Sequence, residues 1–317
     1  METSAKSGVF KYEHSWSIPQ TLENLATALA QGWDVSISTS GSTGAPKEIL
    51  IPASAMIFSA RNSNLFLGAK PGDRWSLLLS PEHTAGINVL VRSIELGTAP
   101  VSETESADFT AIVPTQLFRA LNGDRQLLKH LQGCKAVLVG GAHADENLLV
   151  QAKNLGINCI TTYGMTETSG GCVYNGEPLP GVEIRIGETI EIKGPMLAKV
   201  PLTDGFFATS DLGKVENGKL IILGRADDVI NSGGKKVSLS KVEYALGEQF
   251  AAFGSENSEW GSALNIATTS QTSDEEIQLI LSVKFGVKAL NIFRIKEIPR
   301  TALEKIDRQA LGKLISS

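Results

Sequence analysis

The sequence is poor in cysteine and has no long apolar run. Its 317 residues include only three cysteines, Cys134, Cys159 and Cys172, without CxxC spacing. An odd number in this arrangement does not suggest a disulfide framework, so we expect reduced, buried thiols. No apolar run approaches the length of a membrane span, and the N-terminal residues lack the apolar core of a signal peptide. We therefore expect a soluble, cytoplasmic protein.

An excess of positive charge is also missing. The chain has 29 Lys and Arg against 34 Asp and Glu, a formal net charge of −5. This balance argues against a protein that wraps nucleic acid or binds an anionic membrane. The hydrophobic fraction of 42% is that of an ordinary globular protein, long enough for one large or two ordinary domains.

Short apolar runs alternate with helical patterns through the first two thirds of the chain. This alternation predicts an α/β domain with a mainly parallel sheet, in which ligands bind at the carboxyl ends of the strands. The predicted strands are 34–39, 75–80, 110–114, 135–141 and 157–164, and the predicted helices are 52–68, 86–97 and 144–156.

The pattern changes from about residue 178. Short strands at 182–187, 189–194 and 219–225, separated by Gly-containing turns, predict a small β subdomain. The last part of the chain predicts a separate α+β domain, so we place the domains at 1–226 and 227–317. Within the second domain we expect a helix at 239–250, strands around 263–268 and 277–285, and a final helix from 307.

Residues 36–52, "SISTSGSTGAPKEILIP", place small hydroxyl residues, two glycines and a lysine between two apolar runs. Glycines let backbone N–H groups approach an anion, hydroxyls can donate to phosphate oxygens, and Lys47 adds charge. The segment lacks the GxxxxGK[ST] spacing of a P-loop, and "KEILIP" predicts a strand rather than a helix. Taken alone, it fits a phosphate-binding loop and a solvated linker equally well.

Five further segments follow this loop. They are "VLVGGA" (137–142), "YGMTE" (163–167), "TSDLG" (209–213), "GRADDVINSGGKKV" (224–237) and "PRTALEKIDR" (299–308). Alone, such pieces fit a helix cap, a hairpin turn, a solvated charge pair or a lysine at a helix start. Together, and in this order after "TSGSTGAPK" (39–47), they resemble the adenylate-forming superfamily, which contains acyl- and aryl-CoA ligases, adenylation domains of peptide synthetases and luciferases.

The resemblance implies an ATP site. The 39–47 loop would close over the β- and γ-phosphates, and Tyr163 would lie against the adenine. Asp211 would accept hydrogen bonds from the ribose hydroxyls, and Arg225 would reach the ribose or a phosphate. The full set implied for the nucleotide is Thr39, Ser40, Gly41, Ser42, Thr43, Gly44, Lys47, Gly140, Gly141, Ala142, Tyr163, Gly164, Asp211 and Arg225.

The resemblance also implies three residues for the chemistry. Thr166 would touch the α-phosphate, Glu167 would hold Mg²⁺, and Lys305 would bridge the α-phosphate and the substrate carboxylate. Attack of a carboxylate on a phosphate brings two anions together, so positive charge is needed where negative charge develops. Positioning and electrostatics carry such a transfer without a Ser–His–Asp constellation.

A mobile C-terminal domain is implied as well. Asp227 aligns with the family's hinge, about which the small domain turns between two poses. In one pose Lys305 would enter the active site for adenylation. In the other, residues 231–237 would face the channel for coenzyme A. Gly233 and Gly234 suit a backbone that passes close to a ligand, although a plain turn explains two glycines equally well.

Residues 81–97, "PEHTAGINVLVRSIELG", resemble the substrate segment of o-succinylbenzoate–CoA ligases, which act in menaquinone biosynthesis. Arg92 would bind the second carboxylate of a dicarboxylate substrate, unless its side chain lies on the solvent-exposed face of its helix. His83 would gate or line the acyl pocket rather than bind a metal, because no second ligand lies at useful spacing. Met165 would also approach this pocket.

The sequence departs from the family pattern in places. Glu304 stands where glycine is usual before the lysine, Leu239 where proline is common, and Ala85 where serine is frequent. The phosphate loop also begins early in the chain, as in a shortened N-terminal domain, which leaves room for a homodimer contact. Two alternatives therefore stay open: a CoA ligase for another aryl or short acyl acid, and a non-catalytic protein that binds nucleotide or acyl-adenylate.

Overall fold

The computed structural model describes residues 8–40, 46–142, 144–257, 261–300 and 306–316. The chain forms two compact units. The first unit consists of Met1–Ile186, Glu191–Ala208 and Val215–Ile221, and the second consists of Gly187–Ile190, Thr209–Lys214 and Ile222–Ser317.

A six-stranded sheet forms the centre of the first unit. Its four leading strands are parallel and its last two are antiparallel, as the alternation of strands and helices predicts. The order is β4 (Trp75–Ser76), β5 (Phe109–Ile112), β6 (Ala136–Val139), β7 (Cys159–Met165), β8 (Gly170–Tyr174) and β9 (Glu177–Pro178). The strand predicted at 75–80 forms only over its first two residues, which pair with β5.

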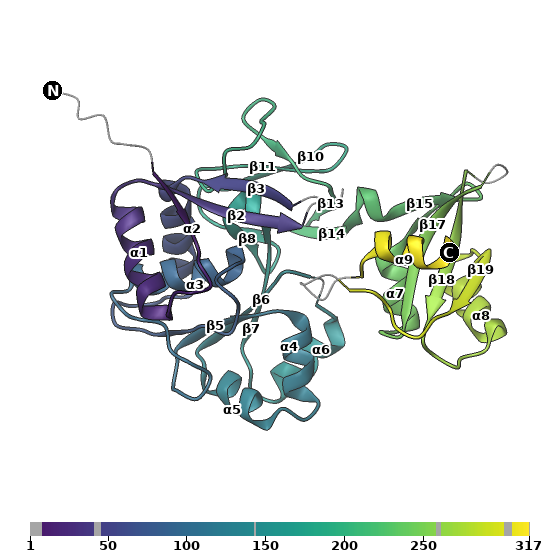
Figure 1. Cartoon of the computed structure of the whole chain (residues 1–317), viewed down its shortest axis with the longest axis horizontal. Helices are drawn as coiled ribbons and strands as arrows, with labels where there is room; N and C mark the ends of the chain where they lie inside the picture. Colours follow the sequence, from purple (N-terminus) through teal and green to yellow (C-terminus); the bar gives the residue numbers. More distant parts are fainter. Residues whose placement is uncertain (1–7, 41–45, 143, 258–260, 301–305, 317) are drawn as a thin grey trace. The chain divides into compact units, whose positions relative to one another are not determined.

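A second sheet of the first unit packs with three helices. Here β1 runs parallel to β2, and β2 forms an antiparallel hairpin with β3. Figure 1 shows the three helices gathered beside these strands, and their apolar side chains meet in one core that includes Leu25, Val35, Met56 and Leu90. The elements are β1 (Val9–Lys11), α1 (Ile18–Ala30), β2 (Asp34–Ser40), β3 (Pro46–Ile51), α2 (Ala53–Phe66) and α3 (Thr84–Glu95).

Three further helices pack with the parallel strands around a second core that includes Ile112, Leu131 and Val137. They are α4 (Pro114–Leu121), α5 (Arg125–Gly133) and α6 (Glu146–Asn154). The helix predicted at 144–156 is confirmed as α6, and the Asp145 carboxylate caps its N-terminus by accepting from the backbone N–H of Asn147 and Leu148.

The short strands predicted after residue 178 are confirmed. A three-stranded sheet and a two-stranded sheet follow the central sheet in sequence. Their strands are β10 (Glu183–Ile186), β11 (Ile190–Lys193), β12 (Phe207–Ala208), β13 (Asp211–Glu216) and β14 (Lys219–Arg225).

The C-terminal part of the second unit is a mixed sheet with three helices (Figure 1). Its strand order is β16, β15, β18, β17, with β19 pairing in parallel with β18. Arg308 connects α9 to the rest of this part by ion pairs, because its guanidinium lies 3.0 Å from the Glu243 carboxylate and 2.8 Å from the Asp228 carboxylate. The elements are β15 (Val229–Ser232), β16 (Lys235–Ser238), α7 (Leu239–Leu246), β17 (Phe250–Asn257), β18 (Gly261–Thr268), α8 (Asp274–Phe285), β19 (Asn291–Arg294) and α9 (Arg308–Ser316).

The strand predicted at 277–285 is wrong, because these residues belong to helix α8. The alternation of apolar residues there suggested a strand. In the structure Ile277 and Leu281, one helical turn apart, are buried, whereas Leu279 and Val283 are 63% and 75% exposed. Strand β17 was not predicted, because its second half is polar.

Candidate active site

The predicted phosphate loop connects the two strands of a hairpin. Thr39 pairs with Lys47 across β2 and β3, and the Thr39 hydroxyl donates to the Lys47 carbonyl oxygen at 3.1 Å. Gly41, Ser42, Thr43 and Gly44 lie outside the described residues, and Ser40 is described by its backbone pairing with Pro46. The Lys47 side chain is exposed, so its ammonium group is accessible to an anion.

The residues predicted for the adenine lie at neighbouring strand ends. Gly140, Gly141 and Ala142 follow β6, and Tyr163 and Gly164 lie near the end of β7, which pairs in parallel with β6. A Cβ atom at Gly140 would collide with the Thr162 hydroxyl, and Gly141 has a φ of 82° that favours glycine. The two glycines therefore allow the segment after β6 to bend close against β7.

Thr166 and Glu167 lie on the turn that follows β7. This turn is a 3₁₀ helix, η1 (Thr166–Thr168), closed by Ser169 in the left-handed region with a φ of 52°. The Thr166 hydroxyl lies 2.8 Å from the Thr84 hydroxyl, and the Glu167 carbonyl oxygen accepts from the backbone N–H of Ala198 at 2.9 Å. Contacts on both sides thus hold the turn in place.

The carboxylate of Glu167 fits the predicted role toward Mg²⁺. Among the described residues, no group of three or more His, Cys, Asp or Glu side chains could hold a metal ion by itself. Mg²⁺ is commonly bound by one or two carboxylates together with substrate phosphates and water. A single half-buried carboxylate beside the predicted phosphate contact Thr166 matches that arrangement.

Asp211 and Arg225 lie together in the second unit. Asp211 opens β13 with a side chain that is mostly buried, and Arg225 closes β14. Their side chains form an ion pair with an N–O distance of 3.8 Å. The Thr209 hydroxyl accepts from the backbone N–H of Asp211 at 3.0 Å and fixes the start of the strand. The structure therefore places side by side the two residues predicted to reach the ribose.

Arg92 is buried on α3, so the alternative that it lies on the solvent-exposed face of the helix is wrong. Only 4% of the residue is exposed. One guanidinium nitrogen donates to the Tyr174 hydroxyl at 3.4 Å, and the group lies 4.9 Å from the centre of the Trp75 ring. Within the described residues its Nε has no hydrogen-bond partner and no carboxylate contacts it. Burial lowers the pKa of Arg92, and Tyr174 opposes this effect.

The other two predicted substrate residues lie at the start of α3 and at the end of β7. His83 is the half-buried residue that precedes α3, and Met165 is the half-buried last residue of β7. Thr84, Asn88 and Tyr174 were not predicted from the sequence. Asn88 and Arg92 lie four residues apart in the helix predicted at 86–97, which indicated that they share one face, whereas Thr84 lies before the predicted start of that helix.

The predicted hinge and coenzyme A residues lie in the second unit. The backbone of Asp227 belongs to a short 3₁₀ helix, η2 (Ala226–Asp228), between β14 and β15. Gly233 and Gly234 form the two-residue turn between β15 and β16, with φ values of 59° and 78°. Positive φ at both positions is what a tight hairpin of this kind requires, so the turn itself accounts for both glycines.

Lys305 lies outside the described residues. The two ends of its segment pair with each other through a bridge between Arg300 and Ile306, and the backbone N–H of Asp307 donates to the Pro299 carbonyl oxygen at 2.9 Å. The described residues on either side of the segment that carries Lys305 therefore lie next to each other in the second unit.

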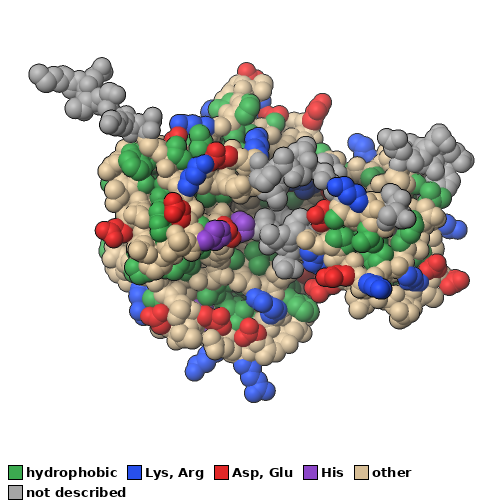
Figure 2. All heavy atoms as spheres, in the orientation of Figure 1, with side chains coloured by type: hydrophobic (Ala, Val, Ile, Leu, Met, Phe, Trp, Pro, Cys, Tyr) green, Lys and Arg blue, Asp and Glu red, His purple; other side chains and the backbone are tan. Residues whose placement is uncertain are grey.

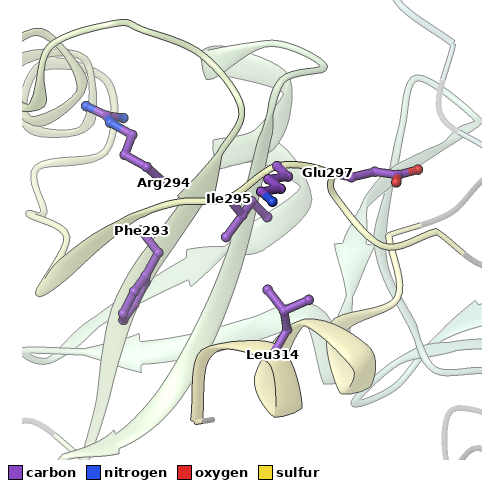
Figure 3. Close-up of a pocket in the computed structure, with 6 residues that line it drawn as sticks. Phe293, Arg294, Ile295, Glu297 and Leu314 are labelled. Atoms are coloured by element: carbon purple, nitrogen blue, oxygen red, sulfur yellow. The ribbon is translucent and has the colours of Figure 1, made fainter.

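A surface hollow of about 460 Å³ in the second unit contains none of the predicted residues. It is lined by Phe293, Arg294, Ile295, Lys296, Glu297 and Leu314, from β19, the segment after it and α9 (Figure 3). On the face shown in Figure 2, acidic and basic side chains are interspersed with hydrophobic ones, in agreement with the small net charge. None of the helices in the described part of the chain has the length and apolar character needed to cross a bilayer.

Comparison with known proteins assigns the arrangement to a family. The family model for AMP-binding enzymes matches residues 34–192, which include the β2–β3 hairpin, α3, the end of β6 and the η1 turn. The chain belongs to the AMP-binding enzymes. This membership confirms the superfamily that the sequence motifs resemble.

The names of two similar proteins refer to the same acid, 2-succinylbenzoate. The chain is 35% identical to a probable 2-succinylbenzoate–CoA ligase of Mycobacterium tuberculosis, over 93% of this chain and 89% of the relative. It is 27% identical to the 2-succinylbenzoate–CoA ligase of Listeria monocytogenes, over 89% of this chain and 71% of the relative.

A solved structure agrees with the family assignment. The chain resembles the o-succinylbenzoate CoA synthetase of Bacillus subtilis in complex with its acyl-adenylate intermediate, with a TM-score of 0.77 and 25% identity. The match covers 87% of this chain and 68% of that one. The α/β fold of an AMP-binding enzyme is thereby confirmed.

Proposed function

We propose that this AMP-binding enzyme is an ATP-dependent acid–CoA ligase that converts 2-succinylbenzoate (o-succinylbenzoate) to its CoA thioester, a step of menaquinone biosynthesis. A carboxylate oxygen of the acid attacks the α-phosphorus of ATP and pyrophosphate leaves. The thiol of coenzyme A then attacks the acyl carbon of the adenylate, loses its proton, and AMP leaves. The protein supplies position and charge for both steps.

The observation that carries the choice of acid is the environment of Arg92. A buried guanidinium without a carboxylate partner costs free energy, unless a ligand supplies the missing anion. 2-Succinylbenzoate has two carboxylates, so one can react while the other binds Arg92. Two relatives, which match 93% and 89% of this chain, are named for the same acid.

The roles of the remaining residues follow from their places. Thr166 and Glu167 on η1 would contact the α-phosphate and hold Mg²⁺, which neutralises phosphate charge when it is bound. Tyr163 and the Gly140–Gly141 bend support an adenine site, and the Asp211–Arg225 pair supports a ribose site. Lys305 would provide the positive charge between the two reacting anions.

We also propose that residues 227–317 act as the mobile domain and turn about Asp227. Support comes from the compact second unit, whose main segment begins at Ile222, and from the short η2 turn at this point. The cytoplasm is the proposed compartment. In its favour, all three cysteines are free thiols, as is usual in a reducing compartment. The homodimer remains a prediction, which sedimentation velocity tests.

The reaction is tested with purified protein, ATP, Mg²⁺, coenzyme A and 2-succinylbenzoate. We expect AMP, pyrophosphate and the thioester in equal amounts, detected by chromatography and mass spectrometry. A mixture without the acid is the control and should release no AMP. Thioester formation from benzoate or a short fatty acid, but not from 2-succinylbenzoate, would favour a ligase for another acid. Bound ATP without any AMP release would favour the non-catalytic alternative.

A further inference from the structure

One face of α3 is polar, although the helix is buried. Thr84, Asn88 and Arg92 follow each other at intervals of four residues, so they lie in a row on that face. They are 6%, 1% and 4% exposed, respectively. Burying three polar side chains in a row is costly unless each finds a hydrogen-bond partner, so the partners of these residues show what the row supports. Arg92 is already proposed to bind the acid, and no role has been given to the other two.

Thr84 contacts the residue predicted to touch the α-phosphate. The hydroxyl oxygens of Thr84 and Thr166 lie 2.8 Å apart, and either can donate. A hydroxyl has one proton to give. If Thr166 gives its proton to Thr84, it has none for a phosphate oxygen. If Thr84 donates instead, the proton of Thr166 is free and its direction is fixed.

Asn88 holds the other end of the same turn. Its side-chain amide donates to the Ser169 carbonyl oxygen at 2.8 Å, and the Ser59 hydroxyl donates to the same oxygen at 3.0 Å. Ser169 has the left-handed conformation that ends η1. A Cβ atom at the next residue, Gly170, would collide with the Asn88 amide. Asn88 and Gly170 therefore fit together, and their contact fixes where η1 ends.

We propose that Thr84 and Asn88 are positioning residues for the adenylation step. Thr84 donates to Thr166 and directs its proton toward the α-phosphate, while Asn88 fixes the bend after Glu167. Both act from the helix that carries Arg92, so the acid site and the phosphate turn share one rigid support. The proposal rests on the proposed function, because it assigns these residues to the acyl-adenylate reaction.

The test for Thr84 replaces its hydroxyl by a methyl group in Thr84→Val and measures acid-dependent ATP–pyrophosphate exchange. We expect kcat to fall about three- to tenfold, the range for one lost hydrogen bond, with the KM for ATP and for the acid changed less than about twofold. Thr84→Ser keeps the hydroxyl and should restore kcat to within about twofold of the unaltered protein.

The matched control is Ser93→Ala. Ser93 is also a fully buried hydroxyl on α3, but it donates to the Val89 carbonyl oxygen of its own helix, away from η1. Its removal should lower stability as Thr84→Val does and leave kcat unchanged. Thermal unfolding checks that each variant folds. If Thr84→Val does not fold, Thr84→Ala takes its place with the same expectation.

A double variant shows whether Thr84 acts through Thr166. Once Thr166→Val has removed the acceptor, adding Thr84→Val should reduce kcat no further. For Asn88, Asn88→Leu removes the amide while keeping similar volume, and it should lower kcat more than either KM. Independent effects of Thr84 and Thr166, or an Asn88→Leu kcat equal to that of Ser93→Ala, would overturn the corresponding assignment.

The proposal and the function on which it rests fail in different ways. A kcat of Thr84→Val equal to that of Ser93→Ala, in a protein that catalyses the exchange, would overturn the role of Thr84 and leave the function standing. No exchange by the unaltered protein would contradict the function itself and remove the step in which both residues are proposed to act.

Discussion

Among the single residues, Arg92 gives the clearest indication that this chain binds a ligand. Arg92 has an aromatic ring and a phenol around its guanidinium but no anion among the described residues. Lysine is a poor substitute there, because it lacks both the planar stacking surface and the fork of donors that binds a carboxylate with two bonds. The choice of arginine therefore supports a planar anionic group as its partner.

Arg92→Lys should raise the KM for 2-succinylbenzoate at least about tenfold, the size of a lost charged hydrogen bond, with little change in the KM for ATP. Steady-state kinetics with each substrate varied in turn measures both constants. Arg61→Lys is the control, since Arg61 is a mostly exposed arginine that pairs with Glu95. An unchanged KM for the acid would mean that Arg92 does not contact it, and would favour a ligase for another acid.

Lys305→Ala should abolish adenylation but spare thioester formation from supplied acyl-adenylate. The lysine is proposed to stabilise the meeting of two anions, which occurs only in the first step. ATP–pyrophosphate exchange reports the first step, and CoA-dependent release of AMP from acyl-adenylate reports the second. Equal loss of both half-reactions would contradict the assignment of two poses.

The motifs predicted the nucleotide residues but not those that support them. Residues 163–167 and 137–142 were identifiable because their order along the chain is specific. Thr84 and Asn88 were not, because a single sequence shows that two residues can share a helix face but not which turn that face will meet. Burial of Arg92 likewise depends on Trp75 and Tyr174, which are distant from it in sequence.

Among the elements, the β2–β3 hairpin, the turn η1 and helix α3 carry predicted site residues of the first unit, whereas η2 is the proposed hinge. Strands β5 to β7 and helices α2, α3 and α6 were predicted near their observed bounds, because each is bracketed by glycine, proline or a capping residue. The error at α8 arose because two exposed apolar residues there imitate the alternation of a strand. Only tertiary packing decides between the two patterns.

Asp227→Pro should slow the CoA-dependent step more than adenylation. Proline fixes one backbone angle near the value of a 3₁₀ helix, so η2 can keep its observed form while the hinge loses freedom. The two half-reactions are measured separately, as for Lys305→Ala, with Asp227→Ala as the control for loss of the carboxylate. A loss confined to adenylation would mean that the hinge has been misplaced.

Helix α5 and strand β4 are joined by a pH-sensitive contact. The imidazole Nε2 of His130 lies 2.7 Å from the Ser76 hydroxyl, and both residues are buried. Burial lowers the pKa of His130 below its ordinary value of 6.5, and the Glu103 carboxylate opposes this effect. The native state thus keeps the ring neutral where the unfolded chain already binds a proton.

The free energy of unfolding should therefore fall as the pH is lowered through about 6.5, since the unfolded state then binds more protons than the native state. Thermal unfolding at about pH 7.5 and about pH 5.5 measures the change in Tm. His130→Gln removes this titration and should reduce the drop in Tm. The same drop in the variant and the unaltered protein would assign the acid sensitivity to other groups.

At the scale of the whole molecule, the two compact units carry different sets of predicted site residues. The first holds the hairpin, the predicted adenine and metal residues and helix α3 with Arg92, and the second holds the Asp211–Arg225 pair and both ends of the Lys305 segment. The α/β class followed from the alternation of strands and helices, and the reaction class from the motifs. The acid was predicted from residues 81–97, and the burial of Arg92 and the named relatives support that prediction.

The central claim is that the chain activates 2-succinylbenzoate as an acyl-adenylate, and acid-dependent ATP–pyrophosphate exchange tests it most directly. The unaltered protein is measured with 2-succinylbenzoate, with benzoate, with short fatty acids and without acid. We predict exchange with 2-succinylbenzoate and background rates with the others. Exchange with a different acid, or no exchange while ATP still binds, would contradict the account.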